Sequence, residues 1–69
     1  MPKFRIRHYP RGFVAEVQKE KGWLFKKRYW THYVSVSGIP SEPWHFSSHD
    51  NALNGLLHQL RRETIENSR

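Results

Sequence analysis

The 69-residue sequence contains no cysteine, so neither a disulfide framework nor a thiolate metal site can supplement its core. It also lacks any apolar run near the ~20 residues of a membrane span, and its basic start lacks the apolar stretch of a signal peptide. These absences predict one small domain over residues 1–69, located in the cytoplasm and without membrane contact. A chain this short buries only about 60% of the surface of its unfolded form, so we expect marginal stability.

Residue types that serve catalysis are equally scarce. The six carboxylates are scattered, and there is no cysteine nucleophile or glycine-rich phosphate loop. The run from Ser47 to Asp50 contains the residue types of a catalytic triad, but capping of a following helix explains it better. His45 and His49 lie four residues apart across an expected strand-to-helix boundary, with no cysteine or carboxylate cluster to complete a zinc site. We therefore predict no enzymatic activity, no metal and no cofactor.

Acidic residues are few in the first half of the chain. Residues 1–28 hold nine Lys or Arg side chains against two Glu, a net charge of +7, whereas residues 29–69 carry −1. A basic cluster of this kind raises the local concentration of anions and their rate of association. The asymmetry indicates an anionic partner; solubility alone is the alternative explanation.

Alternating apolar and polar residues predict two strands at the start of the chain, over about 3–9 and 12–19, joined by a turn at "YPRG". One face of this hairpin is expected to meet the core: Phe4, Ile6, His8, Phe13, Ala15 and Val17. The opposite face is expected to point outward: Lys3, Arg5, Arg7, Tyr9, Val14, Glu16 and Gln18.

A long third strand is predicted over about 23–36, with a distorted or bulged start through "WLFKK". Its more apolar face carries Trp30, His32, Val34 and Val36, which assigns Tyr29, Thr31, Tyr33 and Ser35 to the other face. The segment "SGIPSEP" is expected to form a loop, followed by a short strand at 44–47.

A helix is predicted over about 49–65, with Ser47 or Ser48 as its N-cap. Apolar residues recur at three- and four-residue steps on one side of it: Ala52, Leu53, Leu56, Leu57 and Leu60. The predicted fold is α+β, a small antiparallel sheet of three to four strands with one C-terminal helix packed on one face, in the order β-β-β-(β)-α. One helix covers only one face of the sheet, so the other face is left for water or a partner.

The predicted helix-free face combines cations, aromatic rings and hydroxyl groups. Arginine and lysine neutralise phosphates, tyrosine rings stack on bases, and threonine donates hydrogen bonds to phosphates. A bulge in "KKR" would let three more cations project together at the sheet edge; blocking of aggregation by edge lysines is the competing explanation. The predicted nucleic-acid-binding residues are Arg5, Arg7, Lys26, Lys27, Arg28, Tyr29, Thr31 and Tyr33.

These features predict a small, non-enzymatic nucleic-acid-binding module, with DNA favoured over RNA, of the size that phages and mobile elements often encode. An acidic protein is an alternative partner. A second alternative is a protein-interaction or self-association module, such as a homodimer with Tyr29, Tyr33 and Val14 in its interface. A third is a binder of small anionic nucleotides.

The pattern "RGFVAEVQKEKGW … FKKRYW … PWHFSSHDNALNGL" resembles small DNA-binding domains built from a three-stranded sheet and a helix, namely the arm-type domains of tyrosine-recombinase integrases and AP2-like domains. The resemblance covers about residues 11–60 and is carried by Phe13, Ala15, Val17, Gly22, Phe46, Ser48 and Ala52. It implies insertion of the sheet face into a DNA groove by Arg5, Arg7, Tyr29 and their neighbours. The segment "THYVSVSGIPSE" and the first strand are additions to that pattern, and we expect no catalytic domain after the helix.

Overall fold

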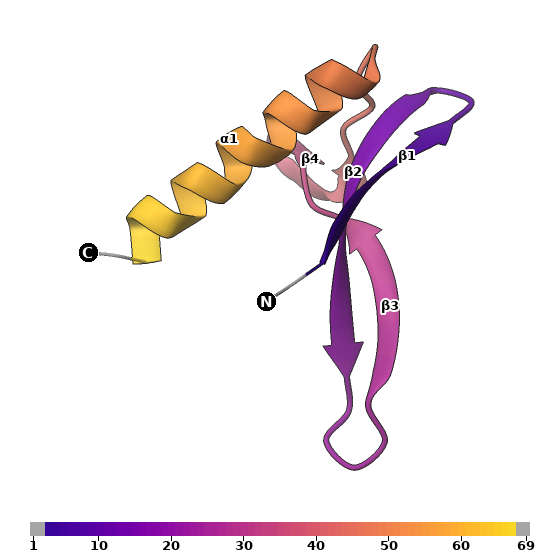
Figure 1. Cartoon of the computed structure of the whole chain (residues 1–69), viewed down its shortest axis with the longest axis vertical. Helices are drawn as coiled ribbons and strands as arrows, with labels where there is room; N and C mark the ends of the chain where they lie inside the picture. Colours follow the sequence, from indigo (N-terminus) through magenta and orange to yellow (C-terminus); the bar gives the residue numbers. More distant parts are fainter. Residues whose placement is uncertain (1–2, 68–69) are drawn as a thin grey trace.

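A computed structural model describes residues 3–67 (Figure 1). The elements in chain order are β1 (Phe4–Tyr9), β2 (Gly12–Lys21), β3 (Lys27–His32), β4 (Ser35–Val36), β5 (Ile39–Pro43) and α1 (His49–Asn67). Strands β1, β2 and β3 form an antiparallel sheet with β2 in the centre, and β4 and β5 form a separate hairpin. The prediction of an α+β fold with an antiparallel sheet and a C-terminal helix is confirmed.

The helix packs against one face of the three-stranded sheet, the helix-side face. This face carries Phe4, Ile6, His8, Phe13, Ala15 and Val17, as the alternation of the first two strands predicts. Ala15 and Val17 are buried there together with Ala52 and Leu56 of α1. The apolar stripe of the helix is narrower than predicted, because Leu53 and Leu57 remain exposed.

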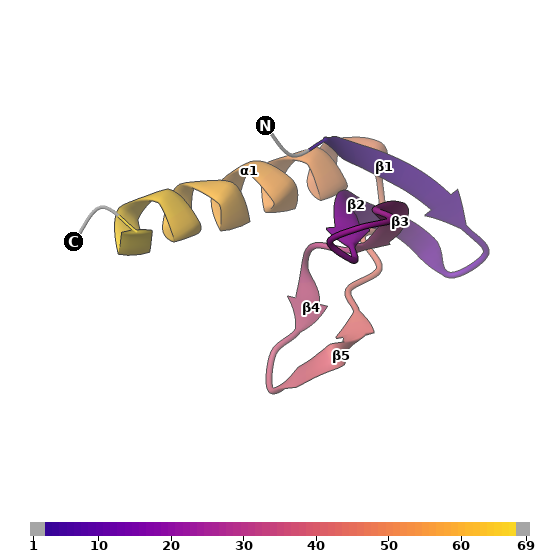
Figure 2. The ribbon, with the colours of Figure 1, turned by 90° about the horizontal axis from the view of Figure 1, so that it is seen from below.

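The opposite face of the sheet, the outer face, is partly covered by the residues around the end of β5. Pro43 and His45 line one hollow together with Val14, Glu16 and Trp30. The β4–β5 hairpin leaves the sheet in a different direction from α1 (Figure 2). Four consecutive residues of β2, Val14 to Val17, are therefore buried, so this central strand is shielded on both faces.

Phe46 connects the sheet to the helix. Its backbone N–H donates to the carbonyl of Phe13 at 2.7 Å, and the N–H of Phe13 donates to the carbonyl of Phe46 at 2.9 Å. This single bridge replaces the strand predicted over 44–47. Gly12, with φ of +141°, fits beside the Phe46 carbonyl, where a Cβ atom would lie only 2.6 Å from the oxygen.

The ring of Phe46 lies against the helix at Gly55. A Cβ atom on Gly55 would lie 2.7 Å from Cε1 of Phe46 and closer still to Cζ. Glycine normally weakens a helix interior by about 1 kcal/mol relative to alanine. Here it permits the close approach of helix and ring that the core requires.

The predicted loop "SGIPSEP" is instead the β4–β5 hairpin, which turns at Gly38 with φ of +83°. Pro40 and Pro43 are tolerated because β5 pairs with β4 alone, and an edge strand does not need every N–H for pairing. The helix begins where predicted. The Ser48 hydroxyl accepts a hydrogen bond from the N–H of Asn51 at 3.1 Å, which makes Ser48 the N-cap.

The prediction for the third strand is wrong in length and in facing. Strand β3 is Lys27–His32, and the register pairs Gln18 with Trp30 and Glu16 with His32. Because paired residues share a face, Trp30 and His32 lie on the outer face with Arg5 and Arg7. Tyr29 and Thr31 therefore have the parity of the helix-side face, opposite to the prediction.

Gly55→Ala should lower the free energy of unfolding by about 1 kcal/mol or more, because the clash with the Phe46 ring outweighs the gain in helix propensity. Urea unfolding followed by circular dichroism measures the effect. Asn54→Ala, at an exposed neighbouring position, is the control and should not destabilise the protein. A Gly55→Ala variant more stable than wild type would contradict this account of the packing.

Candidate nucleic-acid interface

Arg5 lies on the outer face as predicted, but its charge is already neutralised. Its Nε donates to Oε1 of Glu16 at 2.7 Å, and its guanidinium stacks on the Trp30 ring, 4.1 Å from the ring centroid. The Tyr9 hydroxyl donates to the other oxygen of Glu16 at 2.6 Å. Arg5 thus belongs to an internal hydrogen-bonded network and is a weak candidate for binding phosphate.

Glu16 is the buried acid at the centre of this network, with only 6% of its surface exposed. Burial by itself raises the pKa of a carboxyl group. Hydrogen bonds from Tyr9 and Arg5, together with the positive charges of Arg5 and Arg7, outweigh that effect and hold the pKa of Glu16 below its ordinary value of 4.5. The Glu16 carboxylate therefore holds β1 and β2 together in its charged form.

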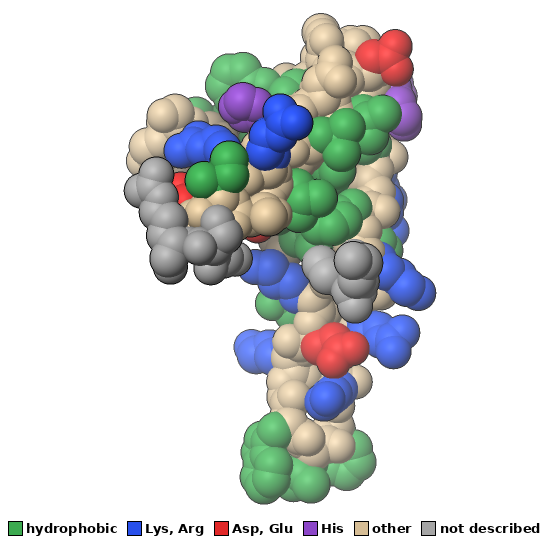
Figure 3. All heavy atoms as spheres, turned by 60° about the vertical axis from the view of Figure 1, so that its left-hand side comes forward, with side chains coloured by type: hydrophobic (Ala, Val, Ile, Leu, Met, Phe, Trp, Pro, Cys, Tyr) green, Lys and Arg blue, Asp and Glu red, His purple; other side chains and the backbone are tan. Residues whose placement is uncertain are grey.

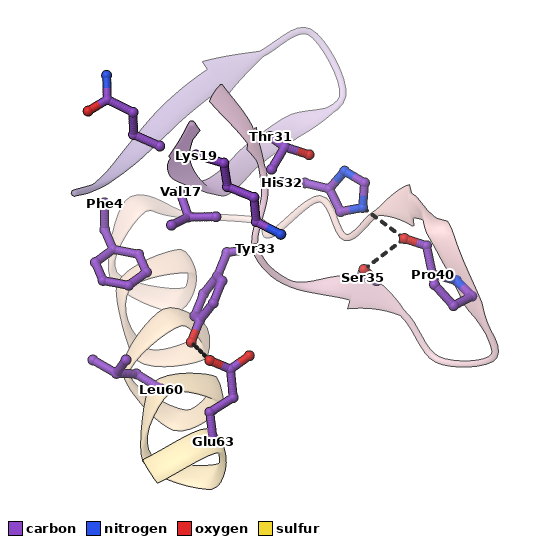
Figure 4. Close-up of a pocket in the computed structure, with 11 residues that line it drawn as sticks. Phe4, Val17, Lys19, Thr31, His32, Tyr33, Ser35, Pro40, Leu60 and Glu63 are labelled. Carbon is purple, nitrogen blue, oxygen red and sulfur yellow. Dashed lines mark hydrogen bonds between the residues drawn. The ribbon is translucent and has the colours of Figure 1, made fainter. Parts of the chain in front are cut away.

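Tyr33 lies beneath the helix rather than on the outer face. Its hydroxyl donates to Oε2 of Glu63 in α1, and its ring meets the edge of Phe4 at a centroid distance of 5.0 Å (Figure 4). Burial raises the pKa of Tyr33 to about 12, with further contributions from the hydrogen bond and the charge of Glu63. The structure thus contradicts the placement of Tyr33 on the helix-free face.

A groove of about 540 Å³ lies beside Tyr33, between the helix-side face and the β4–β5 hairpin. Figure 4 shows its wall: the Nε2 atom of His32 and the hydroxyl of Ser35 both contact the carbonyl oxygen of Pro40, at 2.9 Å and 3.1 Å. Lys19 is the one cation among the residues that line this groove. The groove therefore offers a single positive charge, which is little for an anionic nucleotide.

The interface suggested for self-association is not present as one surface. Val14 is only 2% exposed, on the outer face, and Tyr33 lies under the helix. Of the three residues in that hypothesis, Tyr29 alone is exposed, at 44%. These three residues thus do not share one exposed surface.

Beyond the end of β1, strands β2 and β3 continue as a two-stranded ribbon, which we define as residues 19–29. The register of β1 on β2 ends at Phe4 and Val17, with one further backbone hydrogen bond from Gln18 N–H to the Lys3 carbonyl, whereas β3 pairs with β2 from Glu16 to Lys21. The ribbon therefore projects away from the helix and the core (Figure 1). Beyond Lys19, which lines the groove beside Tyr33, both faces of the ribbon are exposed.

One face of the ribbon, the lysine face, consists of Lys19, Lys21, Lys27 and Tyr29. Lys21 lies directly opposite Lys27, and Lys19 directly opposite Tyr29. The ribbon's acidic residue, Glu20, has the parity of the other face. Like charges placed directly opposite each other on a sheet are destabilising, so the pair of Lys21 and Lys27 lowers the stability of the free protein. The same cluster of positive charge attracts anions.

The "KKR" cations do not project together as predicted. Lys27 and Arg28 are paired regularly with Lys21 and Glu20, so there is no bulge between them and they point to opposite faces. Lys26 and Arg28 both approach Glu20, at 4.0 Å and 3.5 Å. Such exposed ion pairs contribute little to stability and leave both cations accessible.

The ribbon ends in a tip of three large apolar side chains. Trp23, Leu24 and Phe25 are 85%, 71% and 87% exposed. In Figure 3 these apolar side chains form the far end of the ribbon, and Lys and Arg side chains lie along the rest of it. The sequence "GWLFKKRYW" is thus a turn and the start of a strand, and its Trp23 and Phe25 do not enter a core.

The remaining predicted residues are divided between these surfaces. Arg7 is exposed on the outer face, 5.4 Å from the Tyr9 ring centroid. Thr31 is half-buried opposite Val17. The structure brings Lys27 and Tyr29 together on the lysine face and adds Lys19 and Lys21, which are not among the residues predicted from the sequence. The signal that could have found them was the alternation of lysines, "KEK", before the turn.

No group of three or more histidine and acidic side chains within residues 3–67 is placed to hold a metal ion. Within the same residues, α1 is not apolar enough to cross a lipid bilayer. Comparison of the chain with models of protein families, with curated proteins and with solved structures gives no significant match. The resemblance to integrase arm-type and AP2-like domains thus extends only to the fold shape, a three-stranded antiparallel sheet followed by a helix.

Glu16→Gln should destabilise the protein near neutral pH by about 1–3 kcal/mol, because a buried charge-assisted hydrogen-bond network is lost. The pKa of Glu16 is lower in the folded than in the unfolded protein. Its stabilising effect is therefore present above pH 4.5 and lost as the pH falls through the lower, folded-state pKa. In urea unfolding at a series of pH values, the free energy of unfolding should fall less steeply at acid pH (the acid limb) for Glu16→Gln than for wild type. Glu42→Gln, at an exposed site, should leave that limb unchanged.

Tyr33→Phe should make the free energy of unfolding depend less on pH in the alkaline range. The pKa of Tyr33 is raised from 10.0 to about 12, so its stabilising effect is present below pH 10 and lost as the pH rises through about 12. Stability measured between pH 9 and 12 should therefore fall less steeply in the variant. Tyr29→Phe, on the exposed ribbon, is the control, and equal slopes for wild type and Tyr33→Phe would contradict the assignment.

Proposed function

We propose that the protein binds nucleic acid through the β2–β3 ribbon and does no catalysis. The observation that carries the proposal is the lysine face, where Lys21 and Lys27 are directly opposed and Lys19 follows on the same side, with no carboxylate among the ribbon residues of that face. The repulsion between these opposed lysines destabilises the free protein, and a bound polyanion would relieve it by neutralising their charges. Phosphates of a nucleic acid backbone supply that charge at regular intervals.

The proposed phosphate-binding set differs from the one expected on the sheet face. Arg5 is engaged by Glu16, and Tyr33 by Glu63, so neither is offered to a ligand. The cations that project from the ribbon are Lys19, Lys21, Lys26, Lys27 and Arg28. The exposed ring of Tyr29, opposite Lys19, supplies a surface on which a base or sugar can pack.

Duplex DNA fits this ribbon better than duplex RNA. The major groove of B-form DNA is about 12 Å wide and admits a two-stranded ribbon. The major groove of A-form RNA is deep and narrow, and side chains do not reach its base edges. The proposal therefore keeps DNA as the preferred partner, with the cytoplasm as the compartment in which the two meet.

Lys21→Gln/Lys27→Gln should weaken binding to duplex DNA at every sequence tested. Five neutralised phosphates give a log-log salt slope of about −4 to −5, and losing two contacts should make it shallower by about 2. Fluorescence anisotropy at a series of salt concentrations measures both quantities. The variant should fold at least as stably as wild type, because the repulsion between the two lysines is removed.

Arg61→Gln/Arg62→Gln is the matched control for this experiment. It removes the same charge from the exposed side of α1, far along the chain from the ribbon. Its salt slope should stay close to that of wild type. Equal losses in the two double variants would mean that net charge, rather than the ribbon, determines binding.

A further inference from the structure

The tip of the ribbon has no role in the fold. Trp23, Leu24 and Phe25 are each more than two-thirds exposed, whereas the core uses much smaller side chains such as Ala15 and Ala52. Contiguous large apolar groups held in water indicate a site of interaction. The three apolar side chains lie at the end of a ribbon that carries lysines and an arginine. A partner that fits both features has negative charge on its surface and an apolar layer beneath that surface.

Stacked bases between two phosphate backbones have that organisation. Lys21 and Lys27 form the first cross-strand pair behind the turn, one on each strand, and both side chains lie on the lysine face. The turn at 22–26 holds the tip beyond these lysines, so a ribbon that enters the major groove presents the tip first to the base pairs at its floor. With Lys21 and Lys27 facing the phosphates of one wall and Arg28 those of the other, the tip would lie at the level of the base pairs.

Resting on the proposed function, we propose that Trp23, Leu24 and Phe25 insert as an apolar wedge between base pairs, so that the protein selects duplex DNA that is easily kinked. Apolar wedges of this kind unstack a base step and bend the duplex. Unstacking costs least at flexible pyrimidine–purine steps and at mismatches. The substrate class is thus bent, mismatched or otherwise deformable duplex DNA.

The placement of the charges favours DNA over an anionic lipid surface. Cations occur on both faces of the ribbon, with Lys27 on one and Arg28 on the other. They also continue back along the ribbon, since Lys19 lies two residues behind Lys21. The two walls of a DNA groove can contact cations on both faces of the ribbon and at several positions along its length. A planar layer of lipid headgroups can contact cations at only one position along that length.

The test compares wild type with Trp23→Ser/Leu24→Ser/Phe25→Ser on two DNA duplexes that differ only in one central mismatch. Wild type should bind the mismatched duplex about tenfold more tightly and bend it, as followed by energy transfer between labelled DNA ends. The tip variant should lose the preference and the bend but keep the salt slope, because its lysines are unchanged. Ile39→Ser/Leu57→Ser, which removes exposed apolar groups elsewhere, should behave as wild type.

A single-tryptophan variant, Trp30→Phe/Trp44→Phe, adds a direct readout from Trp23. Stacking on bases should quench its fluorescence, whereas insertion into phosphatidylserine vesicles would shift its emission to the blue. Salt-dependent binding without preference, bending or quenching would overturn the wedge and leave the proposed function intact. A blue shift on vesicles together with no binding to either duplex would overturn both.

Discussion

The contact between Phe46 and the two parts of the fold on either side of it determines the arrangement of everything else. Its backbone is bonded to Phe13 of the sheet, and its ring fills the space that Gly55 leaves on the helix. A larger residue at Gly55 would hold the helix away from the sheet, and a side chain at Gly12 would meet the Phe46 carbonyl. With few buried apolar residues available, this close approach compensates for the small size of the core.

Fixing the helix in this position decides which polar groups remain free. The helix brings Glu63 to Tyr33, so that tyrosine is used within the fold. On the outer face, Glu16 takes up Arg5 in the same way. The two internal acids thus remove an arginine and a tyrosine from the set that the sequence offered for binding, and the accessible cations are concentrated on the ribbon.

The sequence predicted the fold class, the first two strands and the helix well, because their apolar residues lie on one side and the capping serine is a local signal. It failed at the third strand for a physical reason. Alternation identifies two faces but not which of them meets the core, and Trp30 is aromatic yet stacks on Arg5 on the outer face. The burial of Glu16 beside Val17 shows that both faces of the central strand are covered, which an alternating pattern does not reveal.

The residues that stabilise the fold and the residues of the ribbon occupy separate parts of the structure. Residues that hold the fold together lie on the sheet, on α1 and at Phe46, whereas the ribbon beyond Gln18 contributes no buried side chain. A change of length or composition in the turn at 22–26 leaves the core contacts as they are. The tip can consequently diversify under selection at little cost to folding, as an antigen-binding loop does on its scaffold.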